Sequence, residues 1–334
     1  MSKLVFFDVH ATDVGRVTRT FPSAKVLEEP LSAETVMHAR DAEIVSIFVT
    51  STADKAVLTQ LPRLKHIACR STGYDNIDLP TAHKQGVLVS NVPSYGENTV
   101  AEYAFTLLLA LARKLRPALE QVESGLIDHA TVIGGDLAGK TLGVVGTGRI
   151  GSHAITIGRG FGMKVVGFDP FPRLELEGQL GFHYMEFREL LKTADFISIH
   201  APLTNATKHL FDAKAFRAMK PTAILINTAR GEIIDTSALV DALTKNQIAG
   251  AGLDVLEGED LLDIHAELQF LSHHRGKKSL ELAGDLAVLQ KLSNVIVSPH
   301  NAFNTSEAID RIWTTSKQNI QSYLDGEPIN LVEA

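Results

Sequence analysis

Cysteine is nearly absent from this chain of 334 residues, which contains only Cys69. A single cysteine excludes an internal disulfide and suits a reducing compartment. Long hydrophobic runs are also absent: the longest, residues 104–112, is far shorter than the roughly 20 residues of a membrane-spanning helix. The apolar run at the N-terminus is too short for a signal peptide. We therefore expect a soluble, cytoplasmic protein.

A large excess of charge of one sign is missing as well. Lysine and arginine number 32 against 39 acidic residues, which gives a net charge of −7 with no basic stripe. This balance argues against a nucleic-acid partner, and a small anionic substrate would need a local cationic site. The length predicts about two domains, and the 45% hydrophobic content is enough for two cores.

Short apolar runs alternate with helical patterns along the whole chain. This rhythm is typical of parallel sheets, so we expect the α/β class, with two doubly wound, Rossmann-like sheets packed side by side. Helices are expected at residues 149–161, 213–219, 236–243 and 305–324. The expected strands form two series, residues 4–9, 44–49, 66–69 and 87–92, then residues 141–145, 165–168, 196–199, 223–226, 249–253 and 295–297.

A longer helix is expected at residues 100–115, with Asn98 as its N-terminal cap. Its hydrophobic side chains are almost continuous, which is more apolar surface than one domain needs to cover. The pattern favours burial between domains or subunits, so we expect a homodimer or a dimer of dimers.

Residues 257–292 interrupt the rhythm, because a loop between a strand and a helix is usually about 2–6 residues long. Their scattered charges, including the run from His273 to Lys278, predict a solvated insertion. The adjacent His273 and His274 are accompanied neither by cysteine nor by a second histidine at helical spacing. We therefore expect no metal site there.

A glycine-rich turn, GTGRIG, directly follows the strand at residues 141–145 and opens a helix. Gly146 would make the tight turn, Gly148 would let the backbone approach a pyrophosphate, and Gly151 would let the helix pack closely on the strand. Asp169 ends the next strand, close to the spacing of about 20 residues at which an acid binds the adenosine ribose. The combination predicts a dinucleotide cofactor.

Asp169 also bears on which dinucleotide is bound. Its carboxylate would repel a 2′-phosphate, so NAD is preferred to NADP. Arg173 lies close by in the sequence and would soften this preference without reversing it.

Polar residues follow the later strands at the point where each strand ends. Ligands of open α/β sheets bind at the carboxyl ends of the strands. We therefore expect these residues to share a crevice. They are His200 after residues 196–199, Thr228 and Arg230 after 223–226, Asp254 and Glu259 after 249–253, and His300 after 295–297.

Three of these residues suit the reduction of a 2-keto acid. Arg230 has the planar fork that binds a carboxylate through two hydrogen bonds. His300 can donate a proton near neutral pH, and Glu259 would favour its charged form. Each also has a structural interpretation: Arg230 in a surface ion pair, Glu259 as part of the acidic insertion, and His300 as a histidine satisfied by its neighbours.

Eight segments carry a further pattern: RSTGYDNIDL from Arg70, NVPSYGENTVAEYA from Asn91, GTGRIG from Gly146, GFDPFP from Gly167, HAPLT from His200, NTARGEIID from Asn227, GLDVLEGE from Gly252 and SPHNAF from Ser298. The resemblance that they carry runs over almost the whole chain. They resemble the D-isomer-specific 2-hydroxyacid dehydrogenase family, and within it the NAD-dependent fermentative D-lactate dehydrogenases. The segments are highly specific for the family and less specific for its substrate.

The resemblance implies a role for each matching residue. Arg230 would clamp the substrate carboxylate, His300 would be the acid–base group, and Glu259 would orient His300. Asp254 would bond the nicotinamide carboxamide, with Thr228 nearby.

Further residues match the family's two binding sites. The motifs place Arg149, Ile150, His200 and Pro202 in the cofactor site, together with the three glycines and Asp169. On the substrate side, the resemblance implies that the backbone amides of Thr72 and Gly73 hold the carboxylate and that Tyr95 and Phe303 shape the pocket.

The resemblance implies reduction of pyruvate to D-lactate with NADH. Residues 1–98 and 302–334 would form a flavodoxin-like substrate domain, and residues 99–301 an NAD-binding domain, with a cleft between the two. Asp260 departs from the proline that often follows the catalytic glutamate, and residues 257–292 are longer than in most relatives. Two alternatives remain: a bulkier branched or aromatic 2-keto acid as substrate, and an NAD-sensing binding protein that regulates transcription.

Overall fold

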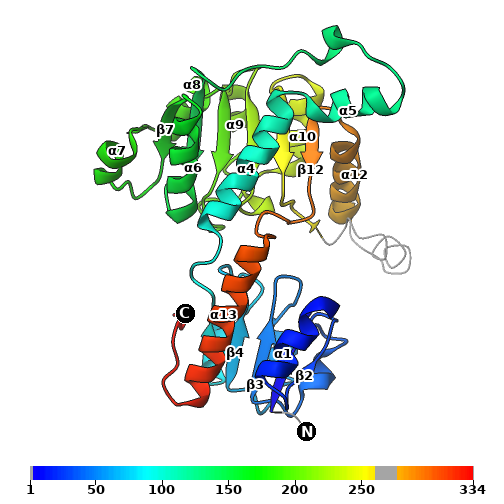
Figure 1. Ribbon diagram of the computed structural model, residues 1–334, viewed down its shortest axis with the longest axis vertical. Helices are drawn as coiled ribbons and strands as arrows, with labels where there is room; N and C mark the ends of the chain where they lie inside the picture. Colours follow the sequence, from blue (N-terminus) through cyan, green and yellow to red (C-terminus); the bar gives the residue numbers. More distant parts are fainter. Residues whose placement is uncertain (1–2, 260–276, 334) are drawn as a thin grey trace. The chain divides into compact units, whose positions relative to one another are not determined.

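The computed structural model describes residues 3–259 and 277–333. The chain divides into two compact units. Unit 1 combines Met1–Tyr95 with Thr305–Ala334, and unit 2 is Gly96–Asn304. Each unit is a parallel sheet with helices on both faces (Figure 1), which confirms the expected α/β class.

Unit 1 contains a five-stranded parallel sheet in the order β2-β1-β3-β4-β5. This is the flavodoxin-like strand order, in which the chain reverses direction across the sheet beside the first strand. The short strands are rich in β-branched and aromatic residues and are almost wholly buried, as expected of a sheet covered on both faces. The strands are β1 (Leu4–Phe6), β2 (Lys25–Val26), β3 (Ile44–Ile47), β4 (His66–Cys69) and β5 (Leu88–Ser90).

The two faces of this sheet carry separate cores, because successive side chains of a strand point to opposite sides. Phe6 packs with Val17 and Ile320 on the face covered by α1 (Val14–Thr20) and α13 (Ser306–Leu324). Val5 and Phe7 belong to the opposite core. The other helices of unit 1 are η1 (Ala11–Asp13), η2 (Val36–Ala39), α2 (Lys55–Leu58) and α3 (Leu79–Lys84).

Unit 2 contains a seven-stranded parallel sheet in the order β12-β11-β10-β9-β6-β7-β8. The chain starts in the middle at β6, runs to one edge, and then crosses to β9 on the other side. That doubly wound order places a topological switch point between β6 and β9. The strands are β6 (Thr141–Val145), β7 (Lys164–Phe168), β8 (His183–Tyr184), β9 (Phe196–Ile199), β10 (Ile224–Asn227), β11 (Gly250–Leu253) and β12 (Val295–Val297).

Helices cover both faces of this second sheet. On one face α4 (Glu97–Ala112) and α6 (Arg149–Gly160) pack together and share one core. The opposite face has another core, which is shared by α8 (Phe187–Thr193), α9 (Ala213–Ala218), α10 (Thr236–Thr244) and α12 (Lys277–Lys291) (Figure 1). The helices predicted from the sequence agree with α6, α9, α10 and α13 to within one residue at each end. The remaining elements are α5 (Leu115–Glu123), η3 (His129–Val132), α7 (Glu175–Leu180) and η4 (Gly231–Ile233).

The long apolar helix differs from the prediction in three ways. Its cap is Gly96, whereas Asn98 lies inside the first turn and donates to Glu102 at 3.1 Å. It ends at Ala112, and α5 follows after Lys114 turns the backbone to a positive φ of 47°. Its buried side chains pack against the sheet of unit 2, so the core of one unit accounts for most of its hydrophobicity. No described helix is long and apolar enough to cross a membrane.

The prediction of a solvated insertion at residues 257–292 is wrong for its second half. Residues Lys277–Lys291 form α12, which packs on α10 and β12. Leu286 and Leu289 are buried in the core of unit 2, where each contributes about 1.5–3 kcal/mol. Two parallel strands must be joined by a crossover of about a dozen residues or more, and α12 provides the one between β11 and β12. His273 and His274 lie outside the described residues.

Candidate active site

One line of paired residues crosses the sheet of unit 2 where its strands end. Asn227 is aligned with Ile199 on one side and with Leu253 on the other, and the alignment continues to Val145 and Val297. The residues just after these strand ends therefore lie along a single edge of the sheet. This places Gly146, His200, Thr228, Asp254 and Ser298 in one row.

The glycine turn has no room for larger residues at two of its three positions. Gly146 has a φ of 90°, and a Cβ there would lie 2.6 Å from the backbone nitrogen of Ala201. A Cβ on Gly151 would lie 2.0 Å from the carbonyl oxygen of Gly146, so the start of α6 sits directly against the turn. Gly148 differs, because a Cβ there would meet nothing within 4 Å. The backbone at Gly148 therefore faces open space.

Asp169 closes the far side of this turn. Its carboxylate accepts hydrogen bonds from the backbone amide of Thr147 at 2.9 Å and from the Phe171 amide at 3.0 Å. Arg173 donates to the carbonyl oxygen of Thr147, also at 2.9 Å. Asp169 and Arg173 thus both bind Thr147, which brings together the two residues that bear on cofactor choice.

The other predicted cofactor residues surround the same edge. His200 donates its backbone amide to Val145 and shares a 2.9 Å contact with Ser198, and burial lowers the pKa of its imidazole to about 4. It is therefore neutral at physiological pH. Arg149 forms an ion pair with Glu97 at 3.7 Å. Two further predicted residues, Ile150 and Pro202, lie at the start of α6 and in the segment after β9.

Asp254 is buried and holds the segment after β12 in place. Its two carboxylate oxygens accept hydrogen bonds from the Ser298 hydroxyl at 2.6 Å and from the backbone amides of Asn301 and Ala302 at 2.8 and 2.7 Å. Its carbonyl oxygen accepts the amide of His300. The sequence motif indicates only a cofactor role for Asp254, whereas the structure shows that it also positions His300.

His300 adopts a backbone conformation that L residues seldom take, with a φ of 50°. Such conformations persist where surrounding contacts over-determine them, and they concentrate at functional sites. Here the contacts come from Asp254. The imidazole Nδ1 lies 3.2 Å from Oε2 of Glu259, and the ring of Phe303 packs edge-on at 6.5 Å between centroids. Nδ1 is thereby occupied, which leaves Nε2 as the nitrogen available to a reactant.

The second carboxylate oxygen of Glu259 is bound by the backbone of its own loop. Its Oε1 accepts the backbone amide of Leu256 at 2.9 Å. Partial burial raises the pKa of Glu259, but the hydrogen bond and charge of His300, the Leu256 amide and the charge of Arg230 outweigh it, so the pKa lies below its usual value. Glu259 is therefore ionised over the whole physiological range.

The loop after β10 presents Arg230 beside this pair. Buried Asn227 ties the loop into a turn, donating to the carbonyl oxygen of Arg230 at 2.8 Å and accepting the Ala229 amide at 3.0 Å. A Cβ on Gly231 would lie only 2.0 Å from the carbonyl carbon of Leu256. Only glycine therefore allows the Arg230 loop and the Glu259 loop to pack against each other.

The predicted substrate residues of unit 1 lie together after β4 and β5. The Thr72 hydroxyl donates to the carbonyl oxygen of Val92 at 2.7 Å, and Asn91 donates to the carbonyl oxygen of Thr72 at 2.8 Å. These bonds anchor the turn that contains Gly73. Tyr95 is half-buried, and its carbonyl oxygen accepts a 2.5 Å hydrogen bond from Arg311.

Several residues that shape the site were missed from the sequence. Asn227 and Ser298 each belong to a quoted motif, but their hydrogen bonds could not be read from it. Glu257 is the least obvious: it pairs with His209 at 3.2 Å and accepts the Thr236 hydroxyl at 3.3 Å, which anchors the loop that carries Glu259. The roles of Ser298 and Glu257 are revealed only by contacts between residues distant in the sequence.

Relatives of known activity match the chain over most of its length. Residues 105–302 match the family described as D-isomer specific 2-hydroxyacid dehydrogenase, NAD binding domain. The glyoxylate reductase of Thermococcus litoralis is 39% identical over 301 residues, which are 88% of this chain and 84% of that protein. The chain belongs to this family.

Solved structures of family members share the fold. D-lactate dehydrogenase from Aquifex aeolicus, complexed with NAD and lactic acid, has a TM-score of 0.87 at 33% identity, covering 97% of this chain and 96% of that one. D-2-hydroxyisocaproate dehydrogenase has a TM-score of 0.81 at 29% identity, covering 99% of both chains. The protein is therefore an NAD-dependent oxidoreductase of the D-2-hydroxyacid dehydrogenase family.

The row at the edge of unit 2 fits an NAD molecule. Gly148 faces open space at the N-terminus of α6, where backbone amides and the helix dipole favour a pyrophosphate. Asp169 is half-buried at the end of β7, where its carboxylate can accept hydrogen bonds from ribose hydroxyls. The Thr228 hydroxyl is buried without a hydrogen-bond partner among the described residues, which is costly unless a ligand supplies one.

Proposed function

We propose that the protein reduces pyruvate to D-lactate with NADH. The observation that carries this proposal is the constellation of unit 2, in which the imidazole of His300 lies 3.2 Å from an ionised Glu259 beside Arg230. The Aquifex aeolicus relative, complexed with NAD and lactic acid, supports the choice of substrate.

Each member of the constellation has a distinct task in this reaction. Arg230 binds the substrate carboxylate through its planar guanidinium. When bound, NADH supplies the hydride for the carbonyl carbon. His300 donates the proton from Nε2 to the carbonyl oxygen, and Glu259 keeps the imidazole oriented and stabilises its protonated form. Asp254 and Ser298 hold the backbone of His300 so that the donor stays in position.

The turn in unit 1 supports recognition of the substrate carboxylate. No described residue accepts a hydrogen bond from the backbone amide of Thr72 or Gly73. Two neighbouring amide donors of this kind suit an anion. We therefore assign substrate binding to Thr72, Gly73, Tyr95 and Phe303, with residues 1–98 and 302–334 as the substrate domain and 99–301 as the cofactor domain.

Phe303 favours a small substrate over a bulkier branched one. Its ring packs edge-on to the imidazole of His300, which restricts the space next to the proton donor. The likeness to D-2-hydroxyisocaproate dehydrogenase makes a branched 2-keto acid the second candidate. The two substrates differ in the volume of the group attached to the carbonyl carbon. An enzyme distinguishes such substrates by the size of the pocket that receives this group.

A panel of 2-keto acids tests the assignment. NADH oxidation by the purified protein is followed with pyruvate, glyoxylate and 2-ketoisocaproate, and the kcat/KM values are compared. We expect pyruvate to exceed 2-ketoisocaproate by at least about tenfold, the discrimination that a hydrophobic pocket achieves against extra methylene groups. A higher value for either competitor would reassign the substrate.

Self-association is proposed through α5 and the segment after it. Apolar side chains there are largely exposed, including Leu119 at 55%, Val122 at 67% and Ile127 at 78%. Exposed apolar patches of this kind mark interaction surfaces. Light scattering at micromolar concentration should give a dimer or a dimer of dimers, and a monomer would count against the proposal.

We also propose that the enzyme works in the cytoplasm, because its single cysteine suits a reducing compartment.

A further inference from the structure

A small cavity lies in unit 1 between α1 and α13, and none of the proposed substrate residues lines it. Its volume is about 150 Å³. Phe6, Phe21 and Trp313 line it, with ring centroids of Phe6 lying 5.8 Å from Phe21 and 6.3 Å from Trp313. Val17 adds a buried aliphatic wall. An apolar cavity of about this size holds a benzene-sized ring.

A buried arginine packs against two of these rings. The guanidinium carbon of Arg70 is 5.8 Å from the ring centroid of Phe6 and 5.1 Å from that of Trp313. Arg70 donates to the Ser46 hydroxyl and to the carbonyl oxygens of Phe7 and Asp8 at 2.7–2.9 Å. These three hydrogen bonds and two ring contacts determine the position of Arg70.

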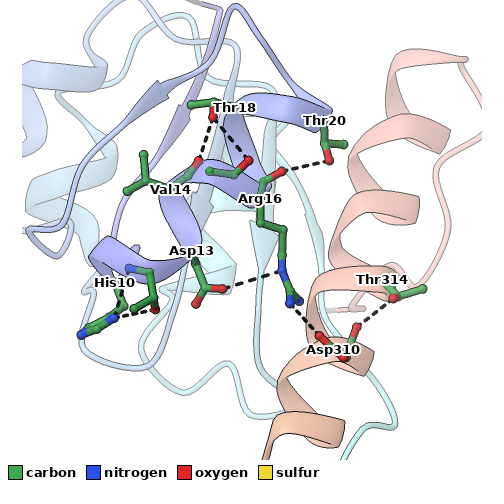
Figure 2. Close-up of polar contacts among 10 residues, drawn as sticks. His10, Asp13, Val14, Arg16, Thr18, Thr20, Asp310 and Thr314 are labelled. Atoms are coloured by element: carbon green, nitrogen blue, oxygen red, sulfur yellow. Dashed lines mark hydrogen bonds and ion pairs between the residues drawn. The ribbon is translucent and has the colours of Figure 1, made fainter.

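The mouth of the cavity carries two further cations. Figure 2 shows Arg16 extending from α1 towards α13, where it pairs with Asp310 at 2.7 Å. It also pairs with Asp13, just before α1, at 3.7 Å. Those carboxylates compensate its charge and hold the guanidinium at the rim. Lys317 also lines the cavity, is exposed, and has no ion-pair partner among the described residues. Lys317 is therefore the lining cation whose charge no carboxylate of the described residues compensates.

A hydroxyl in the wall lacks a partner. Ser316 on α13 lines the cavity and is 1% exposed, and its Oγ has no hydrogen-bond partner among the described residues. A buried hydroxyl without a partner costs free energy, and such groups in native structures call for an explanation. A polar ligand atom close to Ser316 would supply the missing hydrogen bond.

We propose that this cavity binds a small monocarboxylate with an aromatic or branched apolar tail. The tail packs between Phe6, Phe21 and Trp313, where it is removed from water. The carboxylate accepts hydrogen bonds from the Ser316 hydroxyl and from Lys317, the next residue of α13. The site is separate from the residues assigned to substrate and cofactor, and the proposal does not depend on which 2-keto acid the enzyme reduces.

Trp313 makes binding directly measurable, because it is the only tryptophan of the chain. Phenylacetate is titrated into the full-length protein while tryptophan emission is recorded. We expect a saturable change with a Kd of about 1 mM or lower, which is ordinary for a ligand of about ten heavy atoms. 2-Phenylethanol, which has the same ring without the carboxylate, should bind at least about fivefold more weakly, as expected for the loss of one charge-assisted contact.

Two variants locate the site, each with a matched control. Lys317→Met should weaken phenylacetate binding about fivefold by removing the cation, whereas Lys84→Met, at the end of α3, should not. Thr20→Phe places a ring in the cavity and should abolish the response, whereas Thr18→Phe on the same helix should leave it intact. NADH-dependent turnover of each variant verifies that it is folded.

Three results would overturn the proposal. The first is the absence of a saturable change in emission together with the absence of phenylacetate signals in saturation-transfer NMR. The second is equal binding of phenylacetate and 2-phenylethanol, which would exclude an anion site. The third is unchanged binding to folded Lys317→Met and Thr20→Phe proteins, which would place the ligand elsewhere.

Discussion

The two units share an architecture and differ in the residues that come directly after their strands. In unit 2 these are ionisable side chains that neighbouring strand ends hold in position: Asp254 bonds the segment of His300, and Glu259 contacts its ring. In unit 1 the corresponding turn offers backbone amides and hydroxyls. The buried cation there, Arg70, directs its donors at Ser46 and at backbone carbonyls instead of at a ligand.

This difference indicates that two similar folds are distinguished by the residues that follow their strands. Both sheets are parallel and doubly wound, so the strand order alone would assign them equal roles. On the proposed function, the residues immediately after the strands distinguish the unit to which we assign proton transfer from the unit to which we assign binding of the substrate carboxylate by backbone amides. Substitutions in each unit can break that division, and the largest effect is expected at the proton donor.

Removing the proton donor from unit 2 should lower turnover most. His300→Ala is expected to reduce kcat for pyruvate by about 10²–10⁴-fold, the usual contribution of a general acid. Thr72→Ala in unit 1 is the matched control, because it keeps the backbone amide and should change kcat by less than about threefold. Steady-state kinetics on both variants provide the comparison. Equal losses of kcat would remove the acid–base assignment of His300.

Changing the shape of the cationic side chain that binds the substrate carboxylate should affect substrate binding more than cofactor affinity. Arg230→Lys keeps the charge and loses the planar fork, so kcat/KM for pyruvate should fall by about 10²-fold. The Kd for NADH, measured by fluorescence, should stay within about twofold because the dinucleotide contacts other residues. Arg217→Lys on α9 is the control for replacing an arginine by a lysine outside the proposed site. A matching loss of NADH affinity would show that Arg230 supports the cofactor site.

Local patterns in the sequence predicted most of unit 2. The spacing of apolar runs indicated the strands, and their alignment placed His200, Thr228 and Asp254 in one row, since parallel strands end at the same edge. The glycine turn was recognisable because steric demands at Gly146 and Gly151 act over a few residues. Such features depend on local geometry alone.

The features that were missed depend on contacts between distant segments. Helix α12 has few buried positions, chiefly Leu286 and Leu289, so its apolar stripe is weak against its charged surface. The positioning role of Asp254 rests on donors from Ser298 to Ala302, more than forty residues later. No pattern around Asp254 could have identified them.

Cofactor preference should change by a smaller factor than the rates of the His300 and Arg230 variants. Asp169→Ser removes the carboxylate that repels a 2′-phosphate, and we expect the ratio of kcat/KM for NADPH to that for NADH to rise about tenfold. Arg173 binds the same residue of the turn and should then favour the phosphate, so adding Arg173→Ala should reverse part of the gain. If the wild-type enzyme already uses both cofactors equally, Asp169 has no such role.

The smallest expected effect is a shift in the pH profile, and it tests how unit 2 holds its proton donor. Glu259 has a pKa below its ordinary value of 4.5, so it is charged throughout the physiological pH range. That charge lies 3.2 Å from Nδ1 of His300, so it bears directly on the proposed proton donor. Glu259→Gln removes this charge, so the alkaline limb of kcat/KM for pyruvate should move to lower pH.

The linked effect on stability falls on the acidic side. A carboxylate with a depressed pKa contributes stability above its unfolded-state pKa, and the contribution is lost as the pH falls through the folded value. Unfolding of Glu259→Gln should therefore depend less steeply on pH below about 4.5 than unfolding of the wild type. Glu257→Gln is the matched control, since it removes the same charge from the same loop but contacts His209 and Thr236. It should leave the alkaline limb of kcat/KM unmoved; an equal shift in both variants would mean that His300 responds to the general charge of the loop and not to Glu259.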